Sequence, residues 1–162
     1  MELDQQIQLL IDNAPHDGHT PQAMQAIAPA IRLLAQQLRH SQYYILQTLE
    51  RDWVLTTLSN RTNPSLEKRV IYAFANLQDV TADPHFLKDP QVMALPIPVT
   101  HILFQMVAMN SVDSTVFFDT PGNLSSAIEL RREDLQNLIQ AQWQKRSSKP
   151  KIQRSHLPSD IA

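Results

Sequence analysis

Cysteine is absent from this chain of 162 residues, and glycine is rare. The absence of cysteine excludes disulfides, thiolate metal sites and cysteine nucleophiles. Because only two glycines, Gly18 and Gly122, are present, the sequence has no glycine-rich loop of the kind that holds nucleotide phosphates. An excess of positive charge is also lacking. The formal net charge of −2 and the pI of about 6.3 are untypical of a domain that binds nucleic acid through its overall charge.

Long hydrophobic runs are lacking as well. Prolines and polar residues interrupt the longest apolar stretch, residues 95–109, and it is shorter than the roughly 20 apolar residues of a membrane-spanning helix. The segment Met1–Gln6 is acidic and polar, unlike a secretory signal. We therefore expect a cytoplasmic protein.

The residues that are present suit one globular domain. Hydrophobic residues make up 43% of the chain and charged residues 19%, which is typical of a soluble fold. We expect a single α+β domain over residues 1–145. Residues 146–162 are basic and contain serine and proline, so we expect a disordered tail.

Helices are predicted where apolar residues recur every three or four positions. Four such segments occur, at residues 3–11, 20–38, 99–109 and 132–145. Thr20 is the expected N-cap of the second segment, and Pro29 is expected to kink it. The third segment begins after a proline, ends at an asparagine and is apolar on several faces. These features favour a helix that is buried on more than one side, with a buried strand as the alternative.

Strands are predicted where β-branched and aromatic residues gather. Residues 43–49 and 53–58 form the first two, joined by a charged turn, and residues 70–75 form the third, with an extension to residue 80 as the alternative. Short links between these three favour an antiparallel meander. Residues 115–118 and 125–130 predict a second hairpin around the turn at 120–123. The prolines of residues 81–98 predict mostly irregular structure, apart from a short helical turn around residues 86–93.

The predicted element order is therefore α-α-β-β-β-α-β-β-α. Its expected architecture is a five-stranded antiparallel sheet with helices mainly on one face. This order, and the second half in particular, resembles the type III secretion chaperone-like superfamily, including its YbjN-like and uncharacterised cyanobacterial branches. The stretches that carry the resemblance are Ile102–Asn110, Val116–Phe118, Pro121–Asn123, Ile128–Leu130 and Leu135–Ile139.

The resemblance implies a non-catalytic protein that holds a partner segment and forms homodimers. We expect a chaperone-like or assembly-accessory protein that binds other proteins. The expected dimer or partner surface is the apolar helix, through Val99, Ile102, Leu103, Phe104, Met106 and Val107, because its apolar residues exceed what one sheet face can cover.

Candidate catalytic and metal-binding groups are few. His16 and His19, with Asp17 between them, lack the further ligands that a zinc site needs, and His101 on the apolar helix is expected to be a hydrogen-bonded core or interface residue. No nucleophile-elbow motif is present. Two pairs of carboxylates, Glu129 with Glu133 and Asp113 with Asp119, are interpreted as surface charge. We therefore expect no enzyme activity, no metal and no cofactor.

The alternative function lies in the basic tail. Five basic residues fall close together there: Lys145, Arg146, Lys149, Lys151 and Arg154. Such a cluster attracts phosphate groups or anionic lipid at low salt. This alternative is a nucleic-acid or membrane-surface accessory, with membrane contact favoured over nucleic acid.

Overall fold

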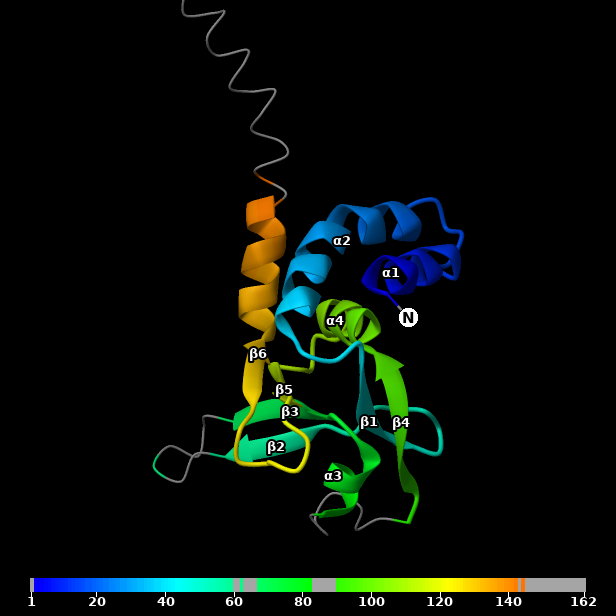
Figure 1. The fold of residues 1–162 in the computed structure, drawn as a ribbon. Helices are drawn as coiled ribbons and strands as arrows, with labels where there is room; N and C mark the ends of the chain where they lie inside the picture. The colour runs from blue at the N-terminus through cyan, green and yellow to red at the C-terminus, as the bar shows by residue number, and fades with distance from the viewer. Residues whose placement is uncertain (1, 60–61, 63–66, 83–89, 143, 145–162) are drawn as a thin grey trace, which may run out of the picture.

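A mixed sheet with helices packed on it organises the part of the chain that the computed structural model describes, residues 2–59, 62, 67–82, 90–142 and 144. Figure 1 shows the arrangement, which confirms the predicted α+β class. In chain order the elements are α1 (Leu3–Asp12), α2 (Thr20–Gln37), β1 (Gln42–Thr48), β2 (Thr56–Ser59), β3 (Glu67–Phe74), α3 (Leu77–Ala82), β4 (Val92–Pro98), α4 (Val99–Ala108), β5 (Ser114–Phe118) and β6 (Ile128–Arg131). A last helix covers residues 132–142.

The sheet has six strands in the order β4-β1-β3-β5-β6, with β2 paired to β3. β3 and β5 run parallel, and all other paired strands run antiparallel. The prediction of five antiparallel strands is therefore wrong in strand number and in one pairing. A parallel pair is possible here because α3, β4 and α4 lie between β3 and β5 in sequence, which is long enough for a crossover connection.

β4 is the strand that the sequence did not predict. Its seven residues pair antiparallel with β1 from Gln42↔Pro98 to Thr48↔Val92, although the prolines indicated irregular structure. β4 lies at the end of the strand order, and proline is tolerated on an edge strand because its nitrogen can face away from the ladder. Of the predicted helical turn, residues 86–89 lie outside the described residues, and 92–93 are strand.

The predicted meander is only partly right. A charged turn does follow β1, with Arg51 at a φ of 69°. However, the returning segment pairs with β1 only through the bridge Gln47↔Trp53. β2 begins at Thr56 rather than at residue 53 and pairs with the first half of β3, whereas β1 pairs with its second half.

The alternative extension of β3 to residue 80 is wrong, because residues 77–82 form α3. Asn76 starts this helix by accepting a hydrogen bond from the backbone N–H of Asp79, at 2.8 Å. This is the usual way in which an asparagine caps a helix N-terminus. α3 buries Val80 with Leu46, Phe74 and Phe118 on the face of the sheet opposite to the other helices.

The main core lies between the sheet and the helices α1, α2 and α4. In Figure 1, α4 lies between the sheet and the pair α1 and α2, and the last helix runs beside α2. A polar link joins these layers: the side-chain oxygen of the buried Gln6 on α1 accepts hydrogen bonds from the backbone N–H and hydroxyl of Thr100, and its amide nitrogen donates to the Ser41 carbonyl. Within the described ranges, every helix is too short or too polar to cross a bilayer.

Candidate binding pocket

A pocket of about 850 Å³ opens beside the edge strand β4. Three elements form its walls: the turn between β1 and β2, the strand β4, and one face of α4. We name it the β4 pocket and define it by its lining residues, Gln47, Arg51, Asp52, Trp53, Leu95, Pro96, Ile97, His101, Gln105 and Met109. Its volume lies in the range of sites that bind small molecules or short segments of other proteins.

The turn after β1 holds Arg51, Asp52 and Trp53 in place. The backbone N–H of Arg51 donates to the Thr48 carbonyl at 2.9 Å, and the Thr48 N–H donates to the Asp52 carbonyl at 2.8 Å. These bonds close a tight turn in which Arg51 takes the left-handed conformation, which is uncommon for a residue with a side chain. The turn thereby places the Trp53 indole against the pocket.

α4 presents one mixed face to the pocket. His101, Gln105 and Met109 line it, and they follow one another at steps of four, the spacing that aligns side chains along one side of a helix. This face differs from the rest of α4, where Val99, Ile102, Leu103 and Met106 are fully buried. The pocket therefore lies against the polar stripe of an otherwise apolar helix.

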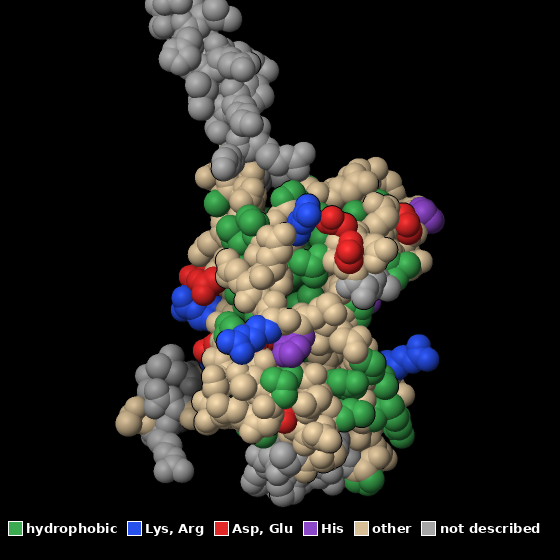
Figure 2. Space-filling view, in the orientation of Figure 1, with side chains coloured by type: hydrophobic (Ala, Val, Ile, Leu, Met, Phe, Trp, Pro, Cys, Tyr) green, Lys and Arg blue, Asp and Glu red, His purple; other side chains and the backbone are tan. Residues whose placement is uncertain are grey.

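β4 supplies the apolar floor. Leu95 and Ile97 point to the same side of the sheet because side chains alternate along a strand, and Met93 continues the same row. Met93 is 41% exposed, and Leu49 in the neighbouring turn is 62% exposed. Figure 2 shows hydrophobic side chains gathered over β4. The apolar surface of the pocket thus extends along the strand.

The charges at the pocket balance. Its lining carries one positive side chain, Arg51, and one negative side chain, Asp52. Partial desolvation lowers the pKa of His101 below its ordinary value of 6.5, which favours the neutral form of this imidazole. The remaining polar groups are the amides of Gln47 and Gln105, each of which can both donate and accept hydrogen bonds.

A second polar cluster lies at the start of β1 and is buried. The hydroxyl of Tyr43 donates to Oδ1 of Asp119 and accepts a hydrogen bond from the His40 backbone N–H at 3.3 Å. The ring nitrogen Nε2 of His40 donates to the Asp119 carbonyl at 2.8 Å. Burial and the contact with Asp119 raise the pKa of Tyr43. Among the residues that the structure describes, Oδ2 of Asp119 has no hydrogen-bond partner.

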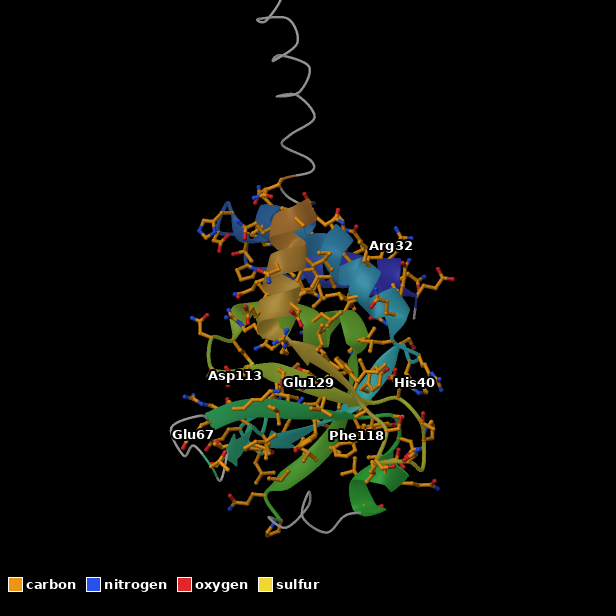
Figure 3. All side chains as sticks on the ribbon, turned by 90° about the vertical axis from the view of Figure 1, so that its left-hand side faces the viewer. Arg32, His40, Glu67, Asp113, Phe118 and Glu129 are labelled. Carbon is orange, nitrogen blue, oxygen red and sulfur yellow. The ribbon has the colours of Figure 1, made fainter. Side chains whose placement is uncertain are left out.

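This cluster joins β1 to the end of β5, and none of its residues lines the β4 pocket. We therefore assign it a structural role. Figure 3 shows His40 at the opposite end of the sheet from Glu67 and Asp113. In the part of the chain that the structure describes, no three His, Asp or Glu side chains come together in a way that could hold a metal ion.

The loop with His16 and His19 caps a helix. The Asp17 carboxylate accepts hydrogen bonds from the backbone N–H groups of His19 and Thr20 and from the Thr20 hydroxyl. Those to Thr20 contribute most to lowering the pKa of Asp17. His19 is the N-cap residue of α2 rather than Thr20, a correction of one position at a helix end. The Asp17 side chain therefore satisfies the N–H groups at the start of α2, and this structural role explains its position between the two histidines.

The structure corrects the placement of the dimer or partner surface on α4. Val99, Ile102, Leu103, Phe104 and Met106 are buried within the single chain, and Val107 is half-buried. α1 and α2 pack on α4 as well as the sheet, so the five buried residues offer no contact surface. The prediction counted only the sheet as a cover for this helix. The basic tail residues Lys145, Arg146, Lys149, Lys151 and Arg154 lie outside the described residues.

The sequence patterns did not predict most of the residues that line the pocket. His101 is exposed at the pocket, so the prediction of a core position is wrong, and the prediction of an interface position stays a prediction. The only local signal was the pair His101 and Gln105, two polar residues at a helical spacing of four in an apolar segment. Trp53 and Leu95 gave no such signal, because strand pairing across the sheet brings them together.

Comparisons with known proteins leave the family of this chain open. No protein-family model matches the sequence, and no curated protein is similar to it.

Proposed function

We propose that this chain is a non-enzymatic protein-binding domain, chaperone-like or an assembly accessory, and that the β4 pocket holds a short segment of its partner. The observation that carries the proposal is the row Met93, Leu95 and Ile97, which extends the apolar floor beyond the pocket walls. At about 3.3 Å per residue, this row spans about 13 Å. Such a length suits an extended segment better than a compact small molecule.

The polar rim supports the same function. Gln105, which is half-buried at the pocket, can bond to a peptide group, which has one donor and one acceptor. Trp53 adds an indole ring, and aromatic side chains are enriched where proteins bind one another. The lining contains no pair of a nucleophile and a base, which fits binding without chemistry.

The test is capture of partners from an extract of the cells that make this protein, with two matched variants. Gln105→Glu places a charge in the pocket at the surface of a helix. Gln22→Glu makes the same change on the exposed surface of α2, outside the β4 pocket. We expect the first variant to lose a partner that the native chain and the second variant both retain. Equal capture by all three chains would contradict the proposal.

Two further variants complete the experiment. Trp53→Ala removes the largest apolar wall of the pocket and should lose the same partner, with circular dichroism used to verify the fold. A chain that ends at Arg146 tests the alternative function. If the partner is lost with the tail and at high salt, the tail carries the binding instead of the pocket.

A further inference from the structure

β6 forms one end of the sheet, at the side of the molecule opposite to β4. It ends the strand order, and none of the described strands pairs with its outer edge. Figure 1 shows β6 and β4 on opposite sides of the fold. The unpaired N–H and C=O groups of such an edge can pair with a strand of another chain. β6 therefore offers backbone groups to a second chain.

The backbone groups that β6 directs outward belong to Glu129 and Arg131. The N–H of Arg132 donates to the Asp113 carbonyl at 2.8 Å, and this pair continues the register of β5 with β6. In an antiparallel ladder, alternate residues bond to the same neighbour. Leu130 therefore also bonds toward β5, and the residues on either side of it face outward. Both of these residues have an N–H group, so the edge offers two donors and two acceptors.

The opposite end of the sheet lacks this capacity. The backbone N–H of Val99 donates to the Ser41 carbonyl at 2.9 Å, so the even-numbered residues of β4 face outward. Two of them are Pro96 and Pro98, which have no N–H group. Proline on an edge strand hinders the addition of another strand. Of the two ends of the strand order, β6 is thus the one that suits strand pairing.

The charges of β6 suit a second copy of the same strand. If two β6 strands pair antiparallel about Leu130, each Glu129 lies directly opposite the partner's Arg131. Because only outward-facing residues can form the new hydrogen bonds, the neighbouring registers are shifted by two residues. One of them sets two Glu129 side chains opposite each other, and the other sets two Arg131 side chains opposite each other. Like charges directly opposite one another are destabilising, so the charges select the register about Leu130.

The ion pairs within one chain are compatible with those between two chains. The Glu129 carboxylate contacts the Lys68 ammonium and accepts a hydrogen bond from the Ser114 hydroxyl at 2.7 Å. Both contacts use Oε2, and a carboxylate has a second oxygen with which to accept. Arg131 contacts Asp134 through two of its nitrogens, and a guanidinium has five N–H donors. In the selected register, positive and negative side chains alternate across the contact from Lys68 to Asp134.

We propose that β6 pairs with β6 of a second copy of this chain, antiparallel and centred on Leu130, to form a two-fold symmetric dimer. The same surface then serves both chains, as is usual for a two-fold dimer. Leu130 of each chain faces its counterpart in a non-hydrogen-bonded pair, whose side chains lie close together. Ile128 is 44% exposed and adds apolar surface on the same face of the strand. The dimer contact is separate from the β4 pocket and does not rest on the proposed function.

The test is analytical ultracentrifugation of charge-reversal variants. Because the contact is small, as in weak complexes, the mass is measured from about 1 to 500 µM. Arg131→Glu makes both ionic contacts Glu–Glu, and Glu129→Arg makes both Arg–Arg. We expect each variant alone to have a dissociation constant at least about tenfold above the native value. Arg32→Glu is the matched control, because it removes an exposed ion pair with Asp4 away from β6, and its dissociation constant should stay within about twofold of the native value.

The decisive measurement is a mixture of the two reversed chains. A Glu129→Arg chain opposite an Arg131→Glu chain regains opposite charges at both contacts. We therefore expect the mixture to form a heterodimer with a dissociation constant within about threefold of the native value. Circular dichroism verifies the fold of each variant. If a reversed chain does not fold, Arg131→Gln replaces it and should weaken the dimer by about threefold or more.

Three results would overturn the proposal. The first is a native chain that stays monomeric up to about 500 µM. The second is a dimer that neither reversal weakens, since another surface would then form it. The third is a pair of weakened variants that do not rescue each other on mixing, since the register would then be wrong. Rescue on mixing supports the proposal, and none of these results decides whether the β4 pocket captures a partner.

Discussion

Removal of the Tyr43 hydroxyl tests how the buried cluster joins β1 to the end of β5. In Tyr43→Phe the ring stays in a fully buried position and only the hydroxyl is lost. Asp119 is 5% exposed, and its Oδ1 then loses the hydroxyl that donates to it. Its Oδ2 has no donor among the described residues even in the native chain. The His40 N–H also loses its acceptor. Leaving buried polar groups unpaired costs about 1–3 kcal/mol, and we expect a loss of about 2 kcal/mol.

The assay is urea and thermal unfolding at pH 7, followed by circular dichroism. For a chain of this length, a loss of about 2 kcal/mol lowers the midpoint temperature by about 4–8 °C. Tyr44→Phe is the matched control, because Tyr44 is half-buried on the other face of β1. We expect its stability to change by less than about 0.5 kcal/mol. Equal effects of the two variants would refute the reasoning, since the hydroxyl of Tyr43 would then contribute nothing specific.

Three further predictions concern Arg132, His101 and the ionisation of Tyr43. Arg132→Ala should destabilise the fold by about 1–3 kcal/mol in urea unfolding, because the guanidinium donates to the carbonyls of Met106 and Val107 at the C-terminal end of α4; an unchanged midpoint would contradict this. Since desolvation lowers the pKa of His101, its contribution to stability is complete above pH 6.5 and declines as the pH falls through its folded pKa. His101→Gln should therefore flatten the pH dependence of the unfolding midpoint between about pH 7 and 5, and identical curves would count against the desolvation. Burial raises the pKa of Tyr43 above 10.0, so stability should fall as the pH rises past that value, and Tyr43→Phe should remove this part of the alkaline loss.

The helices could be predicted because their signals are local. The steps of three and four in α2 and the flanking residues of α4, Pro98 and Asn110, lie within the segments that they define. The fold class followed from these patterns and from the aromatic strands. The pairing of the strands could not be predicted in the same way. β3 and β5 pair in parallel, and nothing in the sequence of either strand alone indicates its partner.

β4 and its pocket were missed for one physical reason. Proline forbids a central strand, yet an edge strand tolerates it where the nitrogen faces outward. Whether Pro96 faces outward depends on the register with β1, which is a property of two segments about fifty residues apart. The pocket needs that register as well as the turn at Arg51, so no single stretch of sequence could indicate it.

The hydrogen bonds between Gln6 and Thr100 have a consequence for synthesis of the chain. The two residues are 94 positions apart, so α1 and α2 leave the ribosome long before the helix that covers their apolar side. During that interval, Ile7 and Ile31 have no complete core to enter. Contacts between distant segments form slowly because the loop between them must first close. A nascent chain that stops before α4 should therefore be a substrate for general chaperones, whatever the finished protein binds.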